Sequence, residues 1–123
     1  MKTVPVIQLK RAYDKAESGD GIRLLVERLW PRGVKKEALK MERWAKDVAP
    51  STELRQWFGH DPEKWAEFKQ RYFAELRANP EAWESILEEA RRETLTLVYS
   101  SHDEAHNNAV ALREFLMERA KKG

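Results

Sequence analysis

The sequence contains no cysteine. Disulfide bonds, zinc sites with thiolate ligands and cysteine nucleophiles are therefore excluded. Glycine and proline are scarce, with five of each among 123 residues. They form neither a Walker loop nor a Gly-x-Gly-x-x-Gly fingerprint, the two common phosphate-binding loops, nor the Gly-x-Ser-x-Gly elbow of hydrolases. The sequence thus lacks the local motifs by which many enzymes are identified, and no catalytic residue and no cofactor is predicted.

Long apolar runs are also missing, since no segment approaches the roughly 18 apolar residues that a membrane span needs. The first residues, Met1 to Pro5, lack the apolar core of a secretory signal, which predicts a cytoplasmic protein. The formal net charge of +2 is too small to indicate nucleic-acid binding on its own. Five tryptophans and 41% hydrophobic residues indicate a folded chain, and its length predicts a single domain over residues 1–123.

The hydrophobic pattern predicts an α/β protein. Residues 4–9, 22–29 and 94–99 are expected to be strands, and the middle one is an almost continuous apolar run, typical of a buried parallel strand. Helical segments are expected over residues 35–48 and after Ser51, Asp61, Asn79 and Ser101. This order favours parallel crossovers, and hence a small, mostly parallel sheet with helices packed on both faces.

Several of these helices have recognisable start signals. Ser51 is a hydroxyl N-cap, and Asp61 followed by Pro62 combines a cap with proline at the first helical position. Asn79-Pro80 repeats that pattern, and Ser101 with Glu104 has the spacing of a capping box. We therefore expect the last helix to begin at Ser101.

The stretch Arg28-Leu29-Trp30-Pro31-Arg32-Gly33 is the most informative part of the sequence. It begins at the carboxyl end of the central predicted strand, and ligands of open α/β sheets bind just beyond the carboxyl ends of the strands. The guanidinium of arginine is a planar fork that matches carboxylate or phosphate groups. Arg28 and Arg32 therefore indicate an anionic small molecule as the ligand.

Other polar residues are expected near the same edge of the sheet. They stand at predicted helix starts, whose free backbone N–H groups favour anions, or at the end of the last strand. The predicted ligand-binding residues are Arg28, Trp30, Arg32, Ser51, Arg55, Tyr99, Ser100 and Asn107. The alternative is structural: the arginines pair with Glu27, Asp47 or Glu53, Ser51 is only a cap, and Tyr99 is a core residue.

Two further readings of the sequence remain open. A non-enzymatic module for protein or nucleic acid would use the Trp30 ring and the basic loop of residues 32–36. His102 and His106 are spaced to share one face of the last predicted helix, where they could hold zinc. No third ligand is fixed by spacing, so a solvated helix start is favoured and no metal is predicted.

The sequence resembles the YeaO-like family of small bacterial and archaeal proteins of unknown function. The resemblance rests on residues 28–33, on Trp44 with the Ala49-Pro50-Ser51-x-x-Leu54-Arg55 motif, on Phe68-x-x-x-Tyr72-x-x-Glu75-Leu76, and on Leu97-x-Tyr99-Ser100 followed by Asn107. It spans nearly the whole chain. It implies a compact α/β fold, a cytoplasmic location and no established reaction. Some relatives appear with a tetrapyrrole methyltransferase label, which does not transfer to a chain this short without a glycine-rich loop.

These observations predict a protein that binds a phosphate or carboxylate compound at the carboxyl edge of its sheet. Whether it also catalyses a reaction on that compound stays open, as do the oligomeric state and the identity of the ligand.

Overall fold

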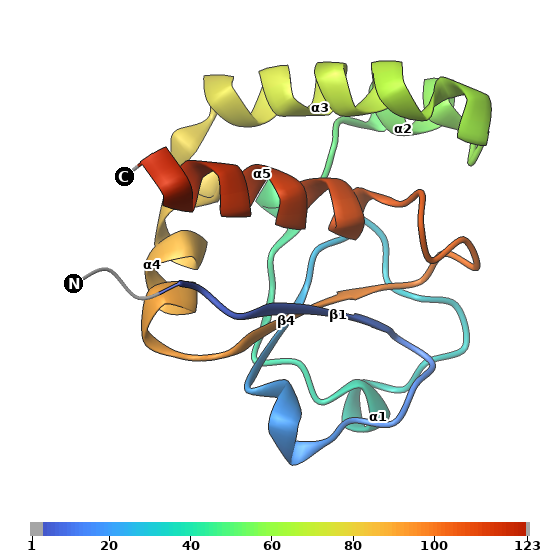
Figure 1. Ribbon diagram of the computed structural model, residues 1–123. Coiled ribbons are helices and arrows are strands. Elements are labelled where there is room, and N and C mark those ends of the chain that lie inside the picture. The colour runs from blue at the N-terminus through green and yellow to red at the C-terminus, as the bar shows by residue number, and fades with distance from the viewer. Residues whose placement is uncertain (1–3, 123) are drawn as a thin grey trace.

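A computed structural model describes residues 4–122 and contains a four-stranded parallel sheet (Figure 1). The strands are β1 (Ile7–Arg11), β2 (Ile22–Leu25), β3 (Arg43–Trp44) and β4 (Leu95–Tyr99), in the spatial order β1-β4-β2-β3. Every strand pair is parallel. The α/β class predicted from the sequence is confirmed. The expectation about residues 1–5 depends partly on residues 1–3, which lie outside the described residues.

Five α-helices accompany the sheet in the described part of the chain. They are α1 (Lys36–Leu39), α2 (Thr52–Phe58), α3 (Trp65–Ala78), α4 (Glu84–Arg92) and α5 (Asn108–Lys122). Short 3₁₀ turns stand at Ser18–Asp20, Lys46–Val48, Pro62–Lys64 and Pro80–Ala82. Within residues 4–122, no helix combines the length and apolarity that crossing a membrane requires.

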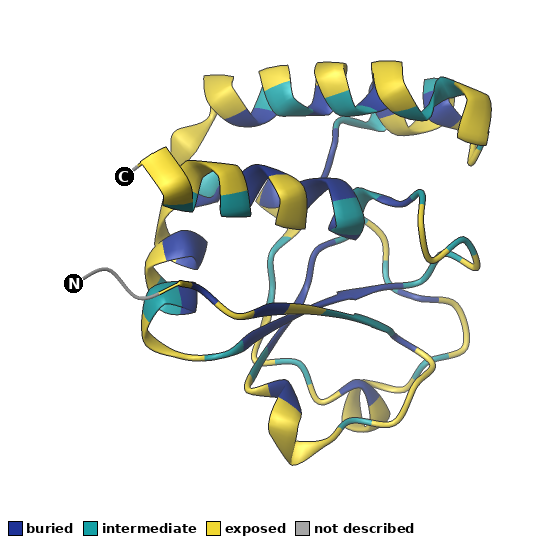
Figure 2. Cartoon of the chain, viewed as in Figure 1, coloured by how far each residue is buried: buried dark blue, intermediate teal, exposed yellow. Residues whose placement is uncertain are grey.

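The helices cover the two faces of the sheet unequally. On one face α5 packs against β4 and β1, and α3 contacts α5 from the outer side (Figure 1). The other face is covered, among residues 4–122, by the short α1 and a small core of Ala12, Leu25, Leu39 and Val98. Both faces of β4 are thus covered, and all five of its residues are buried (Figure 2). The central position of β4 explains why its sequence is mostly apolar.

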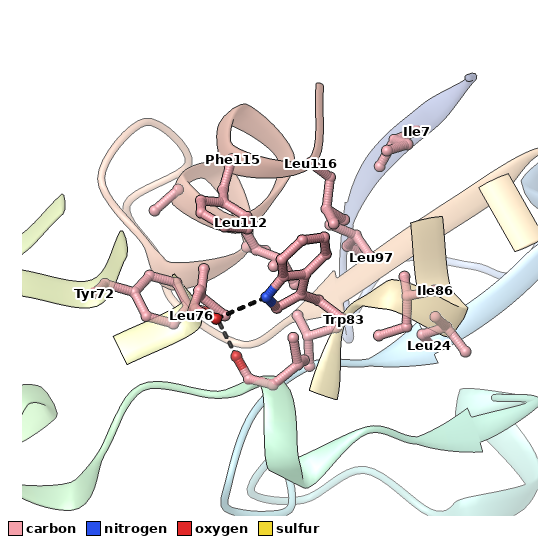
Figure 3. Close-up of a cluster of buried hydrophobic side chains, with 14 of the residues drawn as sticks. Ile7, Leu24, Tyr72, Leu76, Trp83, Ile86, Leu97, Leu112, Phe115 and Leu116 are labelled. Atoms are coloured by element: carbon pink, nitrogen blue, oxygen red, sulfur yellow. Dashed lines mark hydrogen bonds between the residues drawn. The ribbon is translucent and has the colours of Figure 1, made fainter. Parts of the chain in front are cut away.

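The larger core is fixed by aromatic side chains whose polar atoms are satisfied. The indole N–H of Trp83 donates to the Leu76 carbonyl over 2.7 Å (Figure 3). The buried Tyr72 hydroxyl donates to the Val48 carbonyl, and burial raises the pKa of that hydroxyl. Buried Tyr and Trp normally need such partners, and these two bonds hold α3 against α4 and against the segment before α2.

A network of charged residues completes the smaller face. The Asp20 carboxylate accepts from the Arg23 guanidinium at 2.6 Å and from the Lys10 ammonium at 2.9 Å. Arg23 also donates twice to the Leu39 carbonyl, at 3.0 and 2.7 Å. Burial raises the pKa of Asp20, but the hydrogen bonds from Lys10, the Glu17 backbone and Arg23 outweigh it, so the pKa lies below its usual value. The network fixes the turn that leads into β2.

Of the four predicted helix starts, those at Ser51 and Asp61 are confirmed, and those at Asn79 and Ser101 are not. The Ser51 hydroxyl accepts from the Leu54 N–H at 3.2 Å, and the Asp61 carboxylate accepts from the Glu63 N–H at 3.0 Å. Asn79 makes no side-chain cap, and α4 begins only after a 3₁₀ turn. Its N-cap residue, Trp83, has no side-chain acceptor for the first free amides.

The segment 35–48 is not the helix predicted from its sequence. The helix α1 ends after one turn because Lys40 adopts a left-handed conformation, with φ 51°. The chain then forms β3, in which Arg43 and Trp44 pair with Leu24 and Leu25. The prediction for β2 was too long as well, since the strand ends at Leu25 and the following residues turn away to form a loop.

The start of the last helix was predicted seven residues too early. The Ser101 hydroxyl accepts from the N–H of Asp103 at 3.1 Å, and the Asp103 carboxylate accepts from the next two free amides. These local bonds compete with a helix, so α5 begins at Asn108. It is capped by the side-chain Oδ1 of Asn107, which accepts from the Val110 N–H at 3.1 Å. His102 and His106 therefore do not share a helical face.

Candidate functional site

A pocket of about 310 Å³ lies at the carboxyl ends of β2 and β4. The segment after β2 forms one side, and the residues that follow β4 and begin α5 form another. Ala49, Pro50 and α2 close it, with Phe68 reaching in from α3. This is the edge of the sheet at which the sequence predicted a ligand.

The topology explains why a pocket opens there. The neighbouring strands β2 and β4 lead the chain in opposite directions. After β2 the chain proceeds to β3, whereas after β4 it enters α5, which packs over β4 and β1. Ligands of open α/β sheets bind in the crevice formed where adjacent strands diverge in this way.

The three arginines of the predicted site all line the pocket. Arg28 donates weakly to the Pro50 carbonyl, with Nε and Nη2 both 3.4 Å from the oxygen. Arg32 and Arg55 are exposed. Within residues 4–122, none of these three arginines has a carboxylate oxygen within 4.0 Å, so the alternative of ion pairs with Glu27, Asp47 or Glu53 does not describe the structure.

The predicted serines already hold carboxylates of the protein itself. Ser100 donates to Glu27 through its backbone N–H and, at 3.0 Å, through its hydroxyl. Ser51 donates to Glu75 in the same way, at 2.9 Å from the N–H and 2.6 Å from the hydroxyl. Of the two pairs, only Ser100 and Glu27 line the pocket. Both serines therefore donate to a carboxylate of the protein itself, whereas the sequence analysis predicted a ligand as their acceptor.

Glu27 is the pocket residue that the sequence analysis considered only as a partner for arginines. Burial raises the pKa of its carboxyl group, while the Ser100 bonds and the charges of His60 and Arg55 partly offset this. Its backbone carbonyl accepts from the Trp44 indole N–H at 2.6 Å. Its place beside Arg28 was visible in the sequence, but its bond to Ser100, 73 residues away, was not.

Three other predicted residues have structural roles. Tyr99 is buried in the main core and does not line the pocket; burial raises the pKa of its hydroxyl. Asn107 lines the pocket, but its side chain is engaged as the cap of α5 and as a donor to the Asp103 carbonyl. Trp30 lines the pocket with its N–H bonded to the Val34 carbonyl at 2.7 Å and its ring edge-on to Trp44.

The remaining wall combines apolar surface with a strained turn. Phe58 and Phe68 stack with their ring centroids 4.4 Å apart, and both line the pocket. Gly59 and His60 both adopt positive φ, at 53° and 59°, which ends α2 and brings His60 to the pocket. Nothing in the sequence pointed to His60 as a site residue. The arrangement can hold a small molecule with an apolar part and an anionic group.

Metal binding receives no support from the described residues, in which no three His, Asp or Glu side chains form a cluster able to hold an ion. The His106 ring instead lies 3.0 Å from the Asp103 carboxylate, and His102 contacts Arg11 at 3.3 Å.

Comparison with known proteins identifies the family. The family described as "Inactive DUF488-N3 subclade" matches residues 6–123. The chain is 43% identical to the uncharacterised protein YeaO of Escherichia coli, over 89% of this chain and 96% of YeaO. It is 36% identical to the uncharacterised proteins Mb3100c of Mycobacterium bovis and Rv3073c of Mycobacterium tuberculosis, over 92% of this chain and 95% of each relative. No solved structure matches the chain. The chain therefore belongs to the YeaO-like proteins of the inactive DUF488-N3 subclade.

Proposed function

We propose that this protein binds a small anionic molecule, a phosphate or carboxylate compound, in the pocket at the carboxyl edge of its sheet. One observation carries the proposal. Arg28, Arg32 and Arg55 come from two separate segments, line one pocket, and have no carboxylate partner in the described part of the chain. Three unpaired guanidiniums repel each other, and an anion between them relieves that repulsion.

The size and lining of the pocket favour a metabolite over a larger partner. Its volume of about 310 Å³ is at the lower end of the range for small-molecule sites. The Phe58 and Phe68 rings and two prolines supply apolar contact, while the arginines supply charge. The description of the family as inactive favours binding without turnover. We therefore propose a binding protein, located in the cytoplasm, and no catalytic role.

The competing hypothesis is a module that binds nucleic acid through Trp30 and the basic loop of residues 32–36. The exposed side chains of Arg32, Lys35 and Lys36 favour it. The ring of Trp30 argues against it, because the ring is half-buried and its N–H is bonded inside the loop. Binding of that kind would weaken steeply with salt, since it releases counterions from the nucleic acid.

A thermal-shift screen at low salt tests the proposal. The panel contains phosphate, sulfate, sugar phosphates, nucleotides and dicarboxylates. A compound at about a hundredfold excess over its dissociation constant stabilises the folded protein by about 2.7 kcal/mol, which raises the melting temperature by several degrees. We expect Arg32→Ala to weaken binding of the same compound by about tenfold, because a charge-assisted hydrogen bond contributes about 1.5–3 kcal/mol.

The matched control is Arg92→Ala. Arg92 is an exposed arginine in the last turn of α4, outside the pocket, so its removal changes the net charge equally and should leave binding intact. A screen in which no compound stabilises the wild-type protein would refute the proposal. So would equal losses in the two variants, because binding would then follow net charge and not the pocket.

A further inference from the structure

We infer that the ligand carries a hydrogen-bond donor beside its anionic group, and that Glu27 accepts it. The ligand class would then be zwitterionic, with an ammonium group a few bonds from a carboxylate or phosphate, as in amino acids and phosphorylated amines. This inference rests on the proposed function and specifies the ligand of the same pocket.

The carboxylate of Glu27 has unused hydrogen-bonding capacity. An ionised carboxylate offers about four acceptor positions on its two oxygens. The Ser100 N–H and hydroxyl occupy one position on each oxygen. Among the described residues, no other group donates to this carboxylate. Because Glu27 lines the pocket, a bound molecule is the natural donor for the remaining positions.

Glu27 also lacks a neutralising partner among the described residues. Among residues 4–122 Glu27 forms no ion pair, and the positive charge of Arg55 acts on its carboxylate only at a distance. The desolvated carboxylate would repel a ligand that carries only negative charge. A ligand ammonium group would satisfy Glu27 while its acidic group satisfies the arginines.

Hydrogen bonds hold Glu27 in a fixed position. The two Ser100 bonds tie its carboxylate to the end of β4, and the Trp44 bond ties its backbone to the end of β3. Arg28 follows directly in the chain and is held, in turn, against the Pro50 carbonyl. An acceptor and a cation from consecutive residues thus line the same pocket, an arrangement suited to a molecule with both kinds of group.

The opposite possibility is that Glu27 occupies the place of the ligand anion on Ser100 and is displaced on binding. The two ideas make opposite predictions. If Glu27 were displaced, its carboxylate would no longer face the ligand. A simple anion would then bind as tightly as its ammonium counterpart.

Two matched pairs of probes test the inference by calorimetric titration near neutral pH. Aspartate is compared with succinate, and phosphoethanolamine with ethyl phosphate, because each pair differs by one ammonium group. In the wild-type protein we expect the ammonium compound of each pair to bind at least about tenfold tighter, since a hydrogen bond to a charged group contributes about 1.5–3 kcal/mol. In Glu27→Gln this preference should disappear, and the simple anions should bind more tightly than they do to the wild type.

Glu53→Gln is the control. Glu53 is exposed on α2 and does not line the pocket, so its neutralisation should leave the preference unchanged. Should Glu27→Gln fail to fold, the comparison in the wild-type protein decides alone. Simple anions that bind as tightly as their ammonium partners, and lose affinity in Arg32→Ala, would overturn the inference while supporting the proposed function. A wild-type protein that binds no anion at all would overturn both.

Discussion

Replacement of Arg23 by alanine is expected to lower the free energy of unfolding by about 3–5 kcal/mol, because it breaks a buried ion pair by removing the guanidinium partner of Asp20. Both side chains are 5% exposed, and their ion pair measures 2.6 Å. Arg23 also donates twice to the Leu39 carbonyl, which would lose both bonds. Lys10 stays bonded to Asp20. Its ammonium group lacks the planar fork of a guanidinium, however, and so cannot replace the bonds that Arg23 makes.

Urea unfolding of the variant and of Arg43→Ala provides the measurement. Arg43 pairs with Glu89 at 2.5 Å, but its side chain is 45% exposed, and surface pairs contribute only about 0–1 kcal/mol. The difference between the two variants therefore reports the burial of the Asp20 pair. A loss of less than about 1 kcal/mol in Arg23→Ala, within the range of a surface pair, would show that the network does not hold the β2 turn.

Replacement of Trp83 by alanine should destabilise the protein by a similar amount, about 3–5 kcal/mol for a large buried aromatic side chain. Trp83 is 4% exposed and packs edge-on against Phe115, with ring centroids 5.0 Å apart. Its N–H bond to Leu76 joins the end of α3 to the start of α4 (Figure 3). The variant opens a cavity in the main core and breaks this connection.

Trp57→Ala is the matched comparison for Trp83→Ala in the same urea experiment. Trp57 is only half-buried, and its ring contacts the cations of Arg71 and Lys64 at 4.4 and 5.1 Å from the ring centroid. We expect its loss to cost about 1 kcal/mol, typical of a single substitution outside the core. Equal losses for the two tryptophans would contradict the assignment of Trp83 to the centre of the core.

Much of the fold could be predicted because its signals are local. The caps at Ser51 and Asp61 depend on side chains two or three residues from the amides they accept from. The strand β4 was expected because residues 94–99 are rich in strand-forming residues. Such signals need no knowledge of the rest of the chain.

The mistakes arose where tertiary contacts or competing local bonds decided the structure. The two-residue strand β3 exists because β2 offers it an edge, and its own sequence, rich in helix-forming residues, predicts a helix. A series of turns forms in place of the capping box predicted at Ser101 and Glu104, because Ser101 and Asp103 accept hydrogen bonds from the free amides. Residue spacing alone could not distinguish these outcomes.

In the candidate site too, features set by the local sequence could be predicted, and features set by contacts between distant residues could not. The arginines and the edge of the sheet at which they lie followed from strand position and residue type. The partners of the serines did not, because Glu75 and Glu27 lie 24 and 73 residues away from them in the chain. These distant contacts are the basis of our inference that the ligand also donates a hydrogen bond to Glu27.

The most direct test of the account is a titration of inorganic phosphate followed by the backbone amide signals of the isotopically labelled protein. If the pocket binds an anion, the signals of Arg28, Arg55, Ser100 and Asn108 should shift along a common saturating curve. The same shifts should be smaller in Arg32→Ala at equal phosphate and should need about tenfold more phosphate to saturate. Small shifts that are spread over the basic residues of the whole surface and never saturate would contradict the account.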